Sequence, residues 1–232
     1  MYFRHADAIW EEYPQLAAGA LAVEDVSADA DVAGRIASLE ATARSRLAET
    51  TEGELPEIQA WRRTFARMGL KPTQYRCASE ALLRRFRKEG SLPRIHPLVD
   101  LCNAVSLAFA IPVAVFDIAA MDGYVEVRHA TGTETYRTFA GEIESPAPHE
   151  VIFADRGNNA HARRWTNRQS AASAVGAETR SALVVAEALH GSARADVARL
   201  VETIADAVSV FRSARPTTAL LARDSPRFDF SA

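Results

Sequence analysis

Hydrophobic residues recur at helical spacing in several long stretches of the chain. Between residues 32 and 47, for example, Ile36, Leu39, Ala43 and Leu47 fall on one face of a helix. The glycines at positions 69 and 90 end two further stretches of this kind. Helices are therefore predicted at residues 32–47, at 58–68, at 79–88 with Ser79 as the N-cap, at 100–109 and at 193–211.

Shorter apolar or alternating stretches between these helices predict β-strands. Residues 124–128 alternate in the manner of a half-exposed strand, and a turn at 131–134 leads to an expected partner strand at 135–139. Strands are also expected at 15–25, 112–116, 150–154 and 182–188. The pattern predicts an α+β (mixed α/β) fold with a central β-sheet flanked by helices. Residues 215–232, which contain Pro216 and Pro226, are expected to form a poorly anchored tail.

Composition adds limits to this picture. The chain has 232 residues, of which 48% are hydrophobic, so it can bury a core without cross-links. Cys77 and Cys102 are far apart in the sequence, and the histidines show no metal-ligand spacing, so we expect no metal and no cofactor. No apolar run approaches the roughly 20 residues of a membrane helix, and the N-terminus does not resemble a signal peptide. A cytoplasmic protein that does not associate with membranes is expected.

Charge is distributed unevenly along the chain. Residues 1–60 contain 12 acidic and 4 basic residues, whereas residues 62–88 contain nine basic residues and the single acid Glu80. A basic segment without interleaved acids is typical of a surface that binds a polyanion such as a nucleic acid. The alternative is an ordinary solvated helix surface. The residues of this segment that we expect to contact a nucleic acid are Arg62, Arg63, Arg67, Arg76, Arg84, Arg85 and Arg87.

A second candidate for nucleic-acid contact is the loop at residues 155–170. Arg163, Arg164 and Arg168 surround Trp165, and the Gly157-Asn158-Asn159 sequence suggests freedom of movement. Arginine and aromatic side chains on such a loop suit phosphate contacts and base stacking. The alternative is a structural loop anchored by Trp165, with solvated arginines.

The segment 92–117 combines an apolar helix with a buried strand and carries the best pocket candidates. Asp100 and Asn103 lie one helical turn apart, and two polar groups beside an apolar wall suit a small-molecule pocket. Asn103 either lines the pocket or bonds a neighbouring backbone group, and Asp100 either lines it or braces the helix start. His96 either faces the same pocket or lies on the surface.

This segment resembles the B3/B4 domain of the phenylalanyl-tRNA synthetase beta subunit. In that family a V-V-D-x-x-N-Y-V run precedes a G-Q-P-L-H-A-F-D run, and here residues 99–103 (VDLCN) and 112–117 (PVAVFD) occupy those places. The resemblance covers roughly residues 61–187. Other fragments are closer to freestanding members of the family, namely Gly69-Leu70-Lys71-Pro72, Tyr75-Arg76, Ser79-Glu80, Leu83-Arg84-Arg85, the 164–170 run RWTNRQS, and Thr179.

The resemblance implies a single B3/B4-type domain over residues 1–232. Its parts would be an acidic N-terminal segment (1–60), the B3/B4 core (61–190), a C-terminal helix (191–213) and the tail (214–232). It implies a trans-editing aminoacyl-tRNA deacylase, a hydrolase that cleaves the ester of mischarged tRNA. The implied partner is tRNA, and a monomer is favoured. The alternatives are a non-catalytic module that binds tRNA or an amino acid, and a hydrolase of small esters or peptides.

The resemblance also suggests residue roles, with two departures from the synthetase pattern. Ala114 stands where the synthetase has a histidine that bonds the tyrosine hydroxyl, so tyrosyl specificity is not expected. Val185 replaces a glutamate, and Glu187 lies two residues further on the same strand face. A water held by Asn103 or Asn167, backbone amides near Gln169 and Ser170, and the tRNA ribose hydroxyl would perform the hydrolysis. The candidate catalytic residues are Asn103, Asn167, Ser170 and Glu187, and the candidate pocket residues are His96, Asp100, Cys102, Ala114, Gln169 and Thr179.

Overall fold

Two β-sheets lie face to face in the computed structural model, which describes residues 1–211 and 215–231. The inner sheet has the strand order β11-β2-β10-β3, and every neighbouring pair in it is antiparallel. All seven residues of β2 and all seven of β10 are buried, because both faces of the sheet are covered. The strands are β2 (Ala17–Val23), β3 (Val113–Asp117), β10 (Ala182–Ala188) and β11 (Thr217–Leu221).

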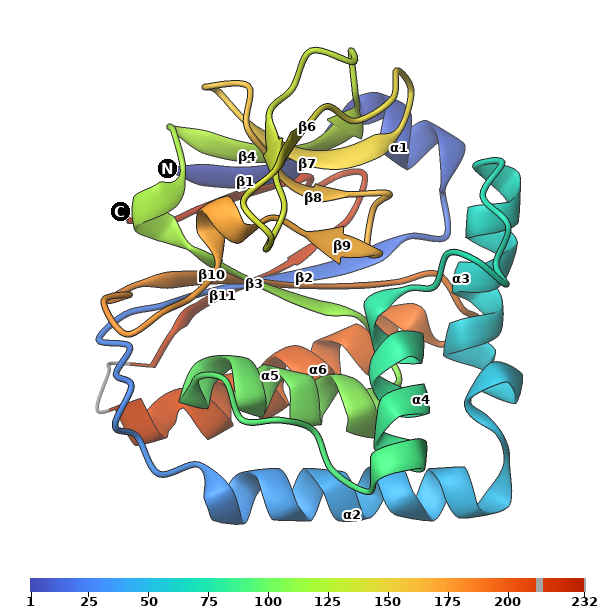
Figure 1. Ribbon diagram of the computed structural model, residues 1–232, viewed down its shortest axis with the longest axis vertical. Coiled ribbons are helices and arrows are strands. Elements are labelled where there is room, and N and C mark those ends of the chain that lie inside the picture. The colour runs from blue at the N-terminus through green and yellow to red at the C-terminus, as the bar shows by residue number, and fades with distance from the viewer. Residues whose placement is uncertain (212–214, 232) are drawn as a thin grey trace.

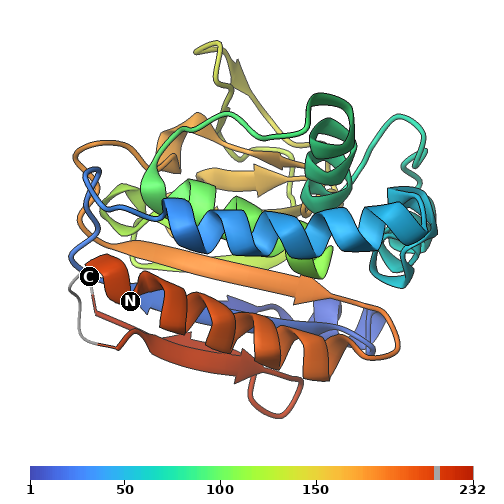
Figure 2. The same ribbon diagram turned by 90° about the horizontal axis from the view of Figure 1, so that it is seen from below.

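Two helices, α5 and α6, cover one face of the inner sheet, and a third, α2, packs against α5 on the side away from the sheet, as Figures 1 and 2 show. They are α2 (Ala33–Glu49), α5 (Pro97–Phe109) and α6 (Ala193–Ala207), which the short helix η4 (Val208–Phe211) follows. The helix α5 lies between α2, α4 and the inner sheet, which explains why its sequence is apolar on nearly all sides.

The outer sheet covers the other face of the inner sheet (Figure 1). Its strand order is β12-β1-β4-β7-β8-β9, and β5 pairs with β6 in a separate ribbon. The bounds are β1 (Tyr2–His5), β4 (Tyr124–His129), β5 (Tyr136–Arg137), β6 (Ile143–Glu144), β7 (Val151–Asp155), β8 (Ala160–Arg163), β9 (Arg168–Gln169) and β12 (Arg227–Asp229).

The remaining helices lie at the ends of the sheets. α3 (Pro56–Arg67) and α4 (Ala78–Glu89) stand at one end, on the right in Figure 1, and α1 (Asp7–Glu12) packs beside the outer sheet. The short helices are η1 (Glu52–Glu54), η2 (Ile118–Ala120) and η3 (Ala171–Ser173). Within the described residues, no helix is both long and apolar enough to span a membrane.

The predicted α+β fold is confirmed, and so are the predicted helices and most of the strands. The N-cap of α4 was assigned wrongly, because the helix begins at Ala78 with Cys77 as its N-cap. Ser79 lies inside the first turn, is fully buried, and has its hydroxyl oxygen 3.4 Å from the Cys77 sulfur. Gly90 ends α4 at a φ of 79°, a left-handed conformation that glycine adopts without strain.

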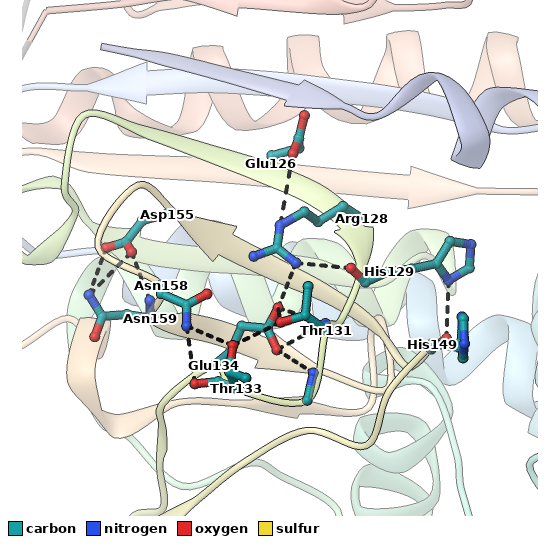
Figure 3. Close-up of polar contacts among 11 residues, drawn as sticks. Glu126, Arg128, His129, Thr131, Thr133, Glu134, His149, Asp155, Asn158 and Asn159 are labelled. Carbon is teal, nitrogen blue, oxygen red and sulfur yellow. Dashed lines mark hydrogen bonds and ion pairs between the residues drawn. The ribbon is translucent and has the colours of Figure 1, made fainter.

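The predicted pairing of 124–128 with 135–139 is wrong. Strand β4 pairs with β1 and β7, whereas the short β5 pairs with β6. The turn itself is real, because the buried Glu134 carboxylate accepts hydrogen bonds from the N–H groups of Thr131 and Gly132 and from Arg128 (Figure 3). Burial alone would raise the pKa of Glu134, but these hydrogen bonds lower it to about 2.

The prediction of a poorly anchored tail is also wrong. β11 pairs with β2 along its whole length, β12 pairs with β1, and Phe228 and Phe230 are buried. The Met1 ammonium group donates to the Phe230 carbonyl at 2.8 Å, so the two ends of the chain lie together. A sequence pattern could not show this, because the partners of these strands come from the first 23 residues. The predicted boundary between helix and tail, at 213 and 214, lies outside the described residues.

Candidate functional site

A cavity of about 60 Å³ lies between the two sheets, at the end where α4 begins. Its walls are mostly apolar and come from β3, β7, β8 and β10, and a turn at residues 165–168 borders it. The lining residues are Ala78, Pro112, Val113, Ala114, Phe153, Ala162, Trp165, Thr166, Asn167, Arg168, Gln169, Val185 and Glu187.

Strand register places in this cavity both residues that differ from the synthetase pattern. Ala114 of β3 pairs with Val185 of β10, and both line the cavity. Glu187 lies two residues beyond Val185, so its side chain points to the same face of the strand. The prediction that Glu187 shares a face with Val185 is confirmed.

Glu187 is a buried carboxylate with two polar partners. Its Oε1 atom lies 2.6 Å from His5 Nε2 and accepts a hydrogen bond from Trp165 Nε1 at 2.9 Å. The side chains of His5 and Glu187 are 0% and 2% exposed, so this contact is shielded from solvent. Hydrogen bonds hold a buried carboxylate in place and offset part of the cost of removing it from water. A carboxyl group held by two hydrogen-bond partners therefore stands in the wall of a mostly apolar cavity.

The turn that borders the cavity has an unusual backbone. Arg164 and Trp165 are consecutive residues with φ values of 47° and 55°, a left-handed region that non-glycine residues enter at a cost. Hydrogen bonds hold this turn, from the Arg164 N–H to Glu150 Oε1 at 2.8 Å and from the Trp165 N–H to the Val151 carbonyl at 2.7 Å.

Thr166 follows these two strained residues and lines the cavity. Its Oγ1 atom is buried and has no hydrogen-bond partner among the described residues. A buried hydroxyl without a partner is uncommon, because it loses its bonds to water and gains none in return. Thr166 therefore contributes a polar atom beside the cavity that has no hydrogen-bond partner among the described residues and is closed to solvent in this structure.

Two predicted site residues in the same turn line the cavity, but their amide groups bond the backbone. Asn167 Nδ2 donates to the Arg76 carbonyl at 2.7 Å, and Gln169 Nε2 donates to the Val115 carbonyl at 2.6 Å. These bonds tie the turn to α4 and to β3, so both amides brace the walls of the cavity.

The residues predicted from α5 do not line this cavity. α5 lies on the opposite face of the inner sheet, and Asn103 is half-buried there. Asp100 accepts a hydrogen bond from the Ile95 N–H at 2.8 Å, and His96 Nδ1 accepts one from the Leu98 N–H at 3.2 Å. Both therefore brace the start of α5, which is the alternative interpretation for Asp100. Cys102 is buried in the helical core, and burial raises the pKa of its thiol to about 12.

Ser170 and Thr179 also have structural roles. The Ser170 hydroxyl donates to the Arg137 carbonyl at 3.0 Å and accepts from the Ala172 N–H at 3.2 Å. The Ser170 N–H donates to the His161 carbonyl, so it is not free to stabilise an oxyanion. Thr179 Oγ1 donates to Asp117 at 2.7 Å, at the far end of β3 from Val113. Neither Ser170 nor Thr179 is among the residues that line the cavity.

Four of the nine cations in the basic segment at 62–88 pair with two buried carboxylates. Arg62 and Arg76 lie 2.7 Å and 3.4 Å from the Glu80 carboxylate, whose side chain is 1% exposed. Arg84 and Arg87 lie 3.0 Å and 3.1 Å from the carboxylate of Glu52. The absence of interleaved acids therefore overstates how many of these cations are free, because η1 supplies a carboxylate that is distant in sequence.

The remaining cations of the segment are of two kinds. Arg85 pairs with Glu89 at 2.8 Å on an exposed helix face. Arg63, Arg67, Lys71 and Lys88 are exposed, and no carboxylate oxygen of the described residues lies within 4.0 Å of them. Arg67 also lies over the Tyr13 ring, at 4.8 Å from its centroid.

The loop at 155–170 is anchored by its tryptophan, as the alternative interpretation held. Trp165 is 0% exposed and packs edge-on against Trp61, with ring centroids 5.1 Å apart, so it cannot stack on a base. Arg163 is buried and pairs with Glu150 at 2.9 Å, which removes it from the available cations. Arg164 lies over the Tyr75 ring at 4.8 Å, and Arg168 is exposed beside the cavity.

Sequence reasoning missed two residues of this site. Thr166 stands inside the run that carries the resemblance, so its place beside Trp165 was the available signal. The contact of His5 with Glu187 could not be predicted, because no sequence pattern places the first strand, β1, opposite β10. Among the described residues, no group of three or more His, Cys, Asp or Glu side chains gathers as a metal site would require.

Comparison with known families assigns residues 60–223 to the B3/4 domain. The matched region includes every wall of the cavity, and the chain belongs to the B3/4 domain family. Among solved structures, the chain is similar to an N-terminal fragment of the phenylalanyl-tRNA synthetase beta-subunit from Pyrococcus horikoshii, with 10% identity and a TM-score of 0.40. That match covers 50% of this chain and 40% of the fragment. Comparison with curated protein sequences gave no match.

Proposed function

We propose that this protein is a trans-acting aminoacyl-tRNA deacylase, which hydrolyses the ester between an amino acid and the terminal ribose of a mischarged tRNA. The observation that carries the proposal is the cavity between the sheets of a B3/4 domain, with the fixed carboxylate of Glu187 in its wall. The amino acid would occupy the cavity, and the ester would lie beside the turn at 165–168.

The groups around the cavity suit a reaction that needs mainly positioning. An aminoacyl ester is already activated, so holding it beside a water molecule supplies much of the required rate. The Thr166 hydroxyl has no hydrogen-bond partner among the described residues, and a small movement of its turn would let it hold the water or the developing oxyanion. Glu187 would bind the positively charged ammonium group of the amino acid. The ribose hydroxyl of the tRNA would assist the attack.

Exposed cations near the cavity would hold the tRNA end. Arg168 borders the cavity directly, and Arg164 belongs to the same turn. Arg63, Arg67 and Lys71 extend this cationic surface along the end of α3. Arginine and lysine at such positions would neutralise backbone phosphates without reading the sequence.

The alternative function is a non-catalytic module that binds an aminoacyl group. One observation favours it: Asn167 and Gln169 both donate to backbone carbonyls, which leaves few polar groups free for catalysis. Incubation of the full chain with a panel of aminoacyl-tRNAs, without added metal or ATP, separates the two functions. We expect hydrolysis of at least one ester, with the Thr166→Val variant slower by roughly tenfold or more. Tight binding of an ester without turnover by either protein would select the binding module.

A further inference from the structure

We propose that the Phe139 ring is a stacking platform for the nucleobase at the 3′ end of the bound tRNA, next to the cavity that takes the amino acid. This inference rests on the proposed function and places a part of the substrate that the cavity itself does not bind. Phe139 is 73% exposed, and it is the one aromatic residue among the exposed large hydrophobic side chains of the described residues. Single exposed apolar side chains are common on proteins, so the position of the ring has to carry the inference.

The ribbon of β5 and β6 holds Phe139 at a fixed place on the surface. In the turn between the two strands, the Thr138 N–H donates to the Glu142 carbonyl at 2.9 Å. Tyr136 of β5 is 1% exposed, and its hydroxyl donates to the Gln169 carbonyl at 2.9 Å, so the ribbon is tied to the outer sheet. A ring that is already fixed loses little conformational entropy when a ligand packs on it.

A hollow at the surface joins Phe139 to the cavity. Phe139 lines this hollow together with Arg168 and Gln169, and the latter two residues also line the cavity. The hollow and the cavity are therefore neighbours that share a wall. In the proposed function the ester lies beside the turn at 165–168, and the terminal base is joined to the ribose that carries this ester. When the amino acid occupies the cavity, the base would therefore lie in the hollow.

The groups around the hollow suit the three parts of a nucleotide. Phe139 offers a ring face, and bases of single-stranded ends stack on such faces. Arg168 is exposed, and its one acidic partner among the described residues, Glu144, is 3.7 Å away, so its guanidinium can also contact a phosphate. Glu142 lines the hollow, and no cation of the described residues lies within 4.0 Å of its carboxylate. This carboxylate can accept a hydrogen bond from the exocyclic amino group of adenine or cytosine.

The test measures binding and needs no hydrolysis. The probe is a fluorescently labelled acceptor-stem RNA minihelix with a single-stranded CCA end, and its affinity for the full chain is read by anisotropy. We expect Phe139→Ala to weaken binding roughly 5- to 140-fold, the range for the loss of one base–aromatic stack. Phe139→Trp should bind at least as tightly as the wild-type protein, and Phe139→Leu, which is apolar but not aromatic, should bind more weakly.

A second probe shows whether the lost contact is with the terminal base. This minihelix is identical except that its 3′-terminal ribose carries no base, and Phe139→Ala should not weaken its binding further. Ile143→Ala is the matched control, because Ile143 is 59% exposed on the same ribbon but does not line the hollow, and it should leave the affinity for both probes unchanged. All of these side chains are exposed, so the melting curves of the variants should match that of the wild-type protein.

The outcomes separate this inference from the function on which it rests. If Phe139→Ala weakens binding of the intact minihelix alone but no aminoacyl-tRNA is hydrolysed, the stacking platform stands and the deacylase function fails. If esters are hydrolysed but Phe139→Ala leaves binding unchanged, or weakens both probes equally, the platform is overturned and the function stands. No binding of the minihelix would also overturn the platform. A dimer in sedimentation velocity that Phe139→Ala dissociates, with unchanged RNA affinity, would assign the ring instead to a contact between two copies of this chain.

Discussion

The three unpaired cations at the end of α3 lead to a quantitative prediction about tRNA binding. Arg63, Arg67 and Lys71 are exposed and have no carboxylate of the described residues within 4.0 Å, so their full charge is available to phosphates. The triple variant Arg63→Ala, Arg67→Ala, Lys71→Ala should bind tRNA more weakly at low salt and depend less on salt concentration. Both effects follow because fewer counterions are released on binding.

The magnitude follows from the number of phosphate contacts. Each neutralised phosphate of a duplex contributes about 0.9 to the slope of log K against log salt concentration, so three contacts contribute about 2.7. Between about 50 mM and 200 mM salt, a fourfold change, the wild-type protein should lose about 40-fold more affinity than the variant. Fluorescence anisotropy with a labelled tRNA, repeated across this salt range, measures the two slopes.

The matched control removes three cations that the structure shows to be paired. Arg84 and Arg87 lie beside Glu52, and Arg85 lies beside Glu89, so the triple alanine variant at these positions should change the slope by less than about 1. Melting curves must accompany it, because Glu52 is buried and would lose its partners. A control slope that falls more than the slope of the first variant would refute the pairing argument.

Four further predictions concern single elements. Glu187→Gln should lower turnover roughly ten- to a hundredfold in a deacylation assay, and unchanged turnover would remove Glu187 from the site. Asn103→Ala should leave turnover unchanged, contrary to the expectation from sequence, because Asn103 lies on the opposite face of the inner sheet. Glu134→Gln should lower the free energy of unfolding by about 3 kcal/mol at neutral pH, because the folded-state pKa is about 2 instead of 4.5. This difference should be complete above pH 4.5 and disappear as the pH falls towards 2, which urea titrations at several pH values would show. Deletion of residues 227–232 should lower the melting temperature markedly, since Phe228 and Phe230 leave the core, and an unchanged melting curve would contradict the pairing of β12.

The sequence predicted elements well where the signal is local. The periodic apolar face of residues 193–211 became the expected helix, α6 with η4, and the ambiguous segment 182–188 became the strand that its apolar residues 183–185 favoured, β10. Prediction failed where pairing is long-range. Residues 217–221 became a strand because β2 offers an open edge to them, which no pattern within the tail itself reveals.

The candidate site shows the same contrast between local features, which the sequence predicts, and long-range contacts, which it does not. Strand alternation placed Glu187 on the face of Val185, and the structure puts both in the cavity. Helical spacing placed Asp100 and Asn103 together but could not say which face of the sheet α5 covers. The polar partner of Glu187 is 182 residues away in the chain, at His5, so only the folded structure could bring the two together.

Acidic and basic residues that are far apart in the sequence pair with each other in the folded protein. The cations that remain unpaired determine where a polyanion would bind. Buried carboxylates such as Glu80 require nearby cations, because an unpaired buried charge is costly. One of the cations that remain free, Lys71, is connected to the cavity through a series of contacts. Lys71 accepts a backbone hydrogen bond from Tyr75, whose ring lies under Arg164, and Arg164 begins the turn that presents Thr166 to the cavity. These contacts place a free cation, Lys71, two steps from the turn at the cavity, which is where the proposed function requires a phosphate to be held.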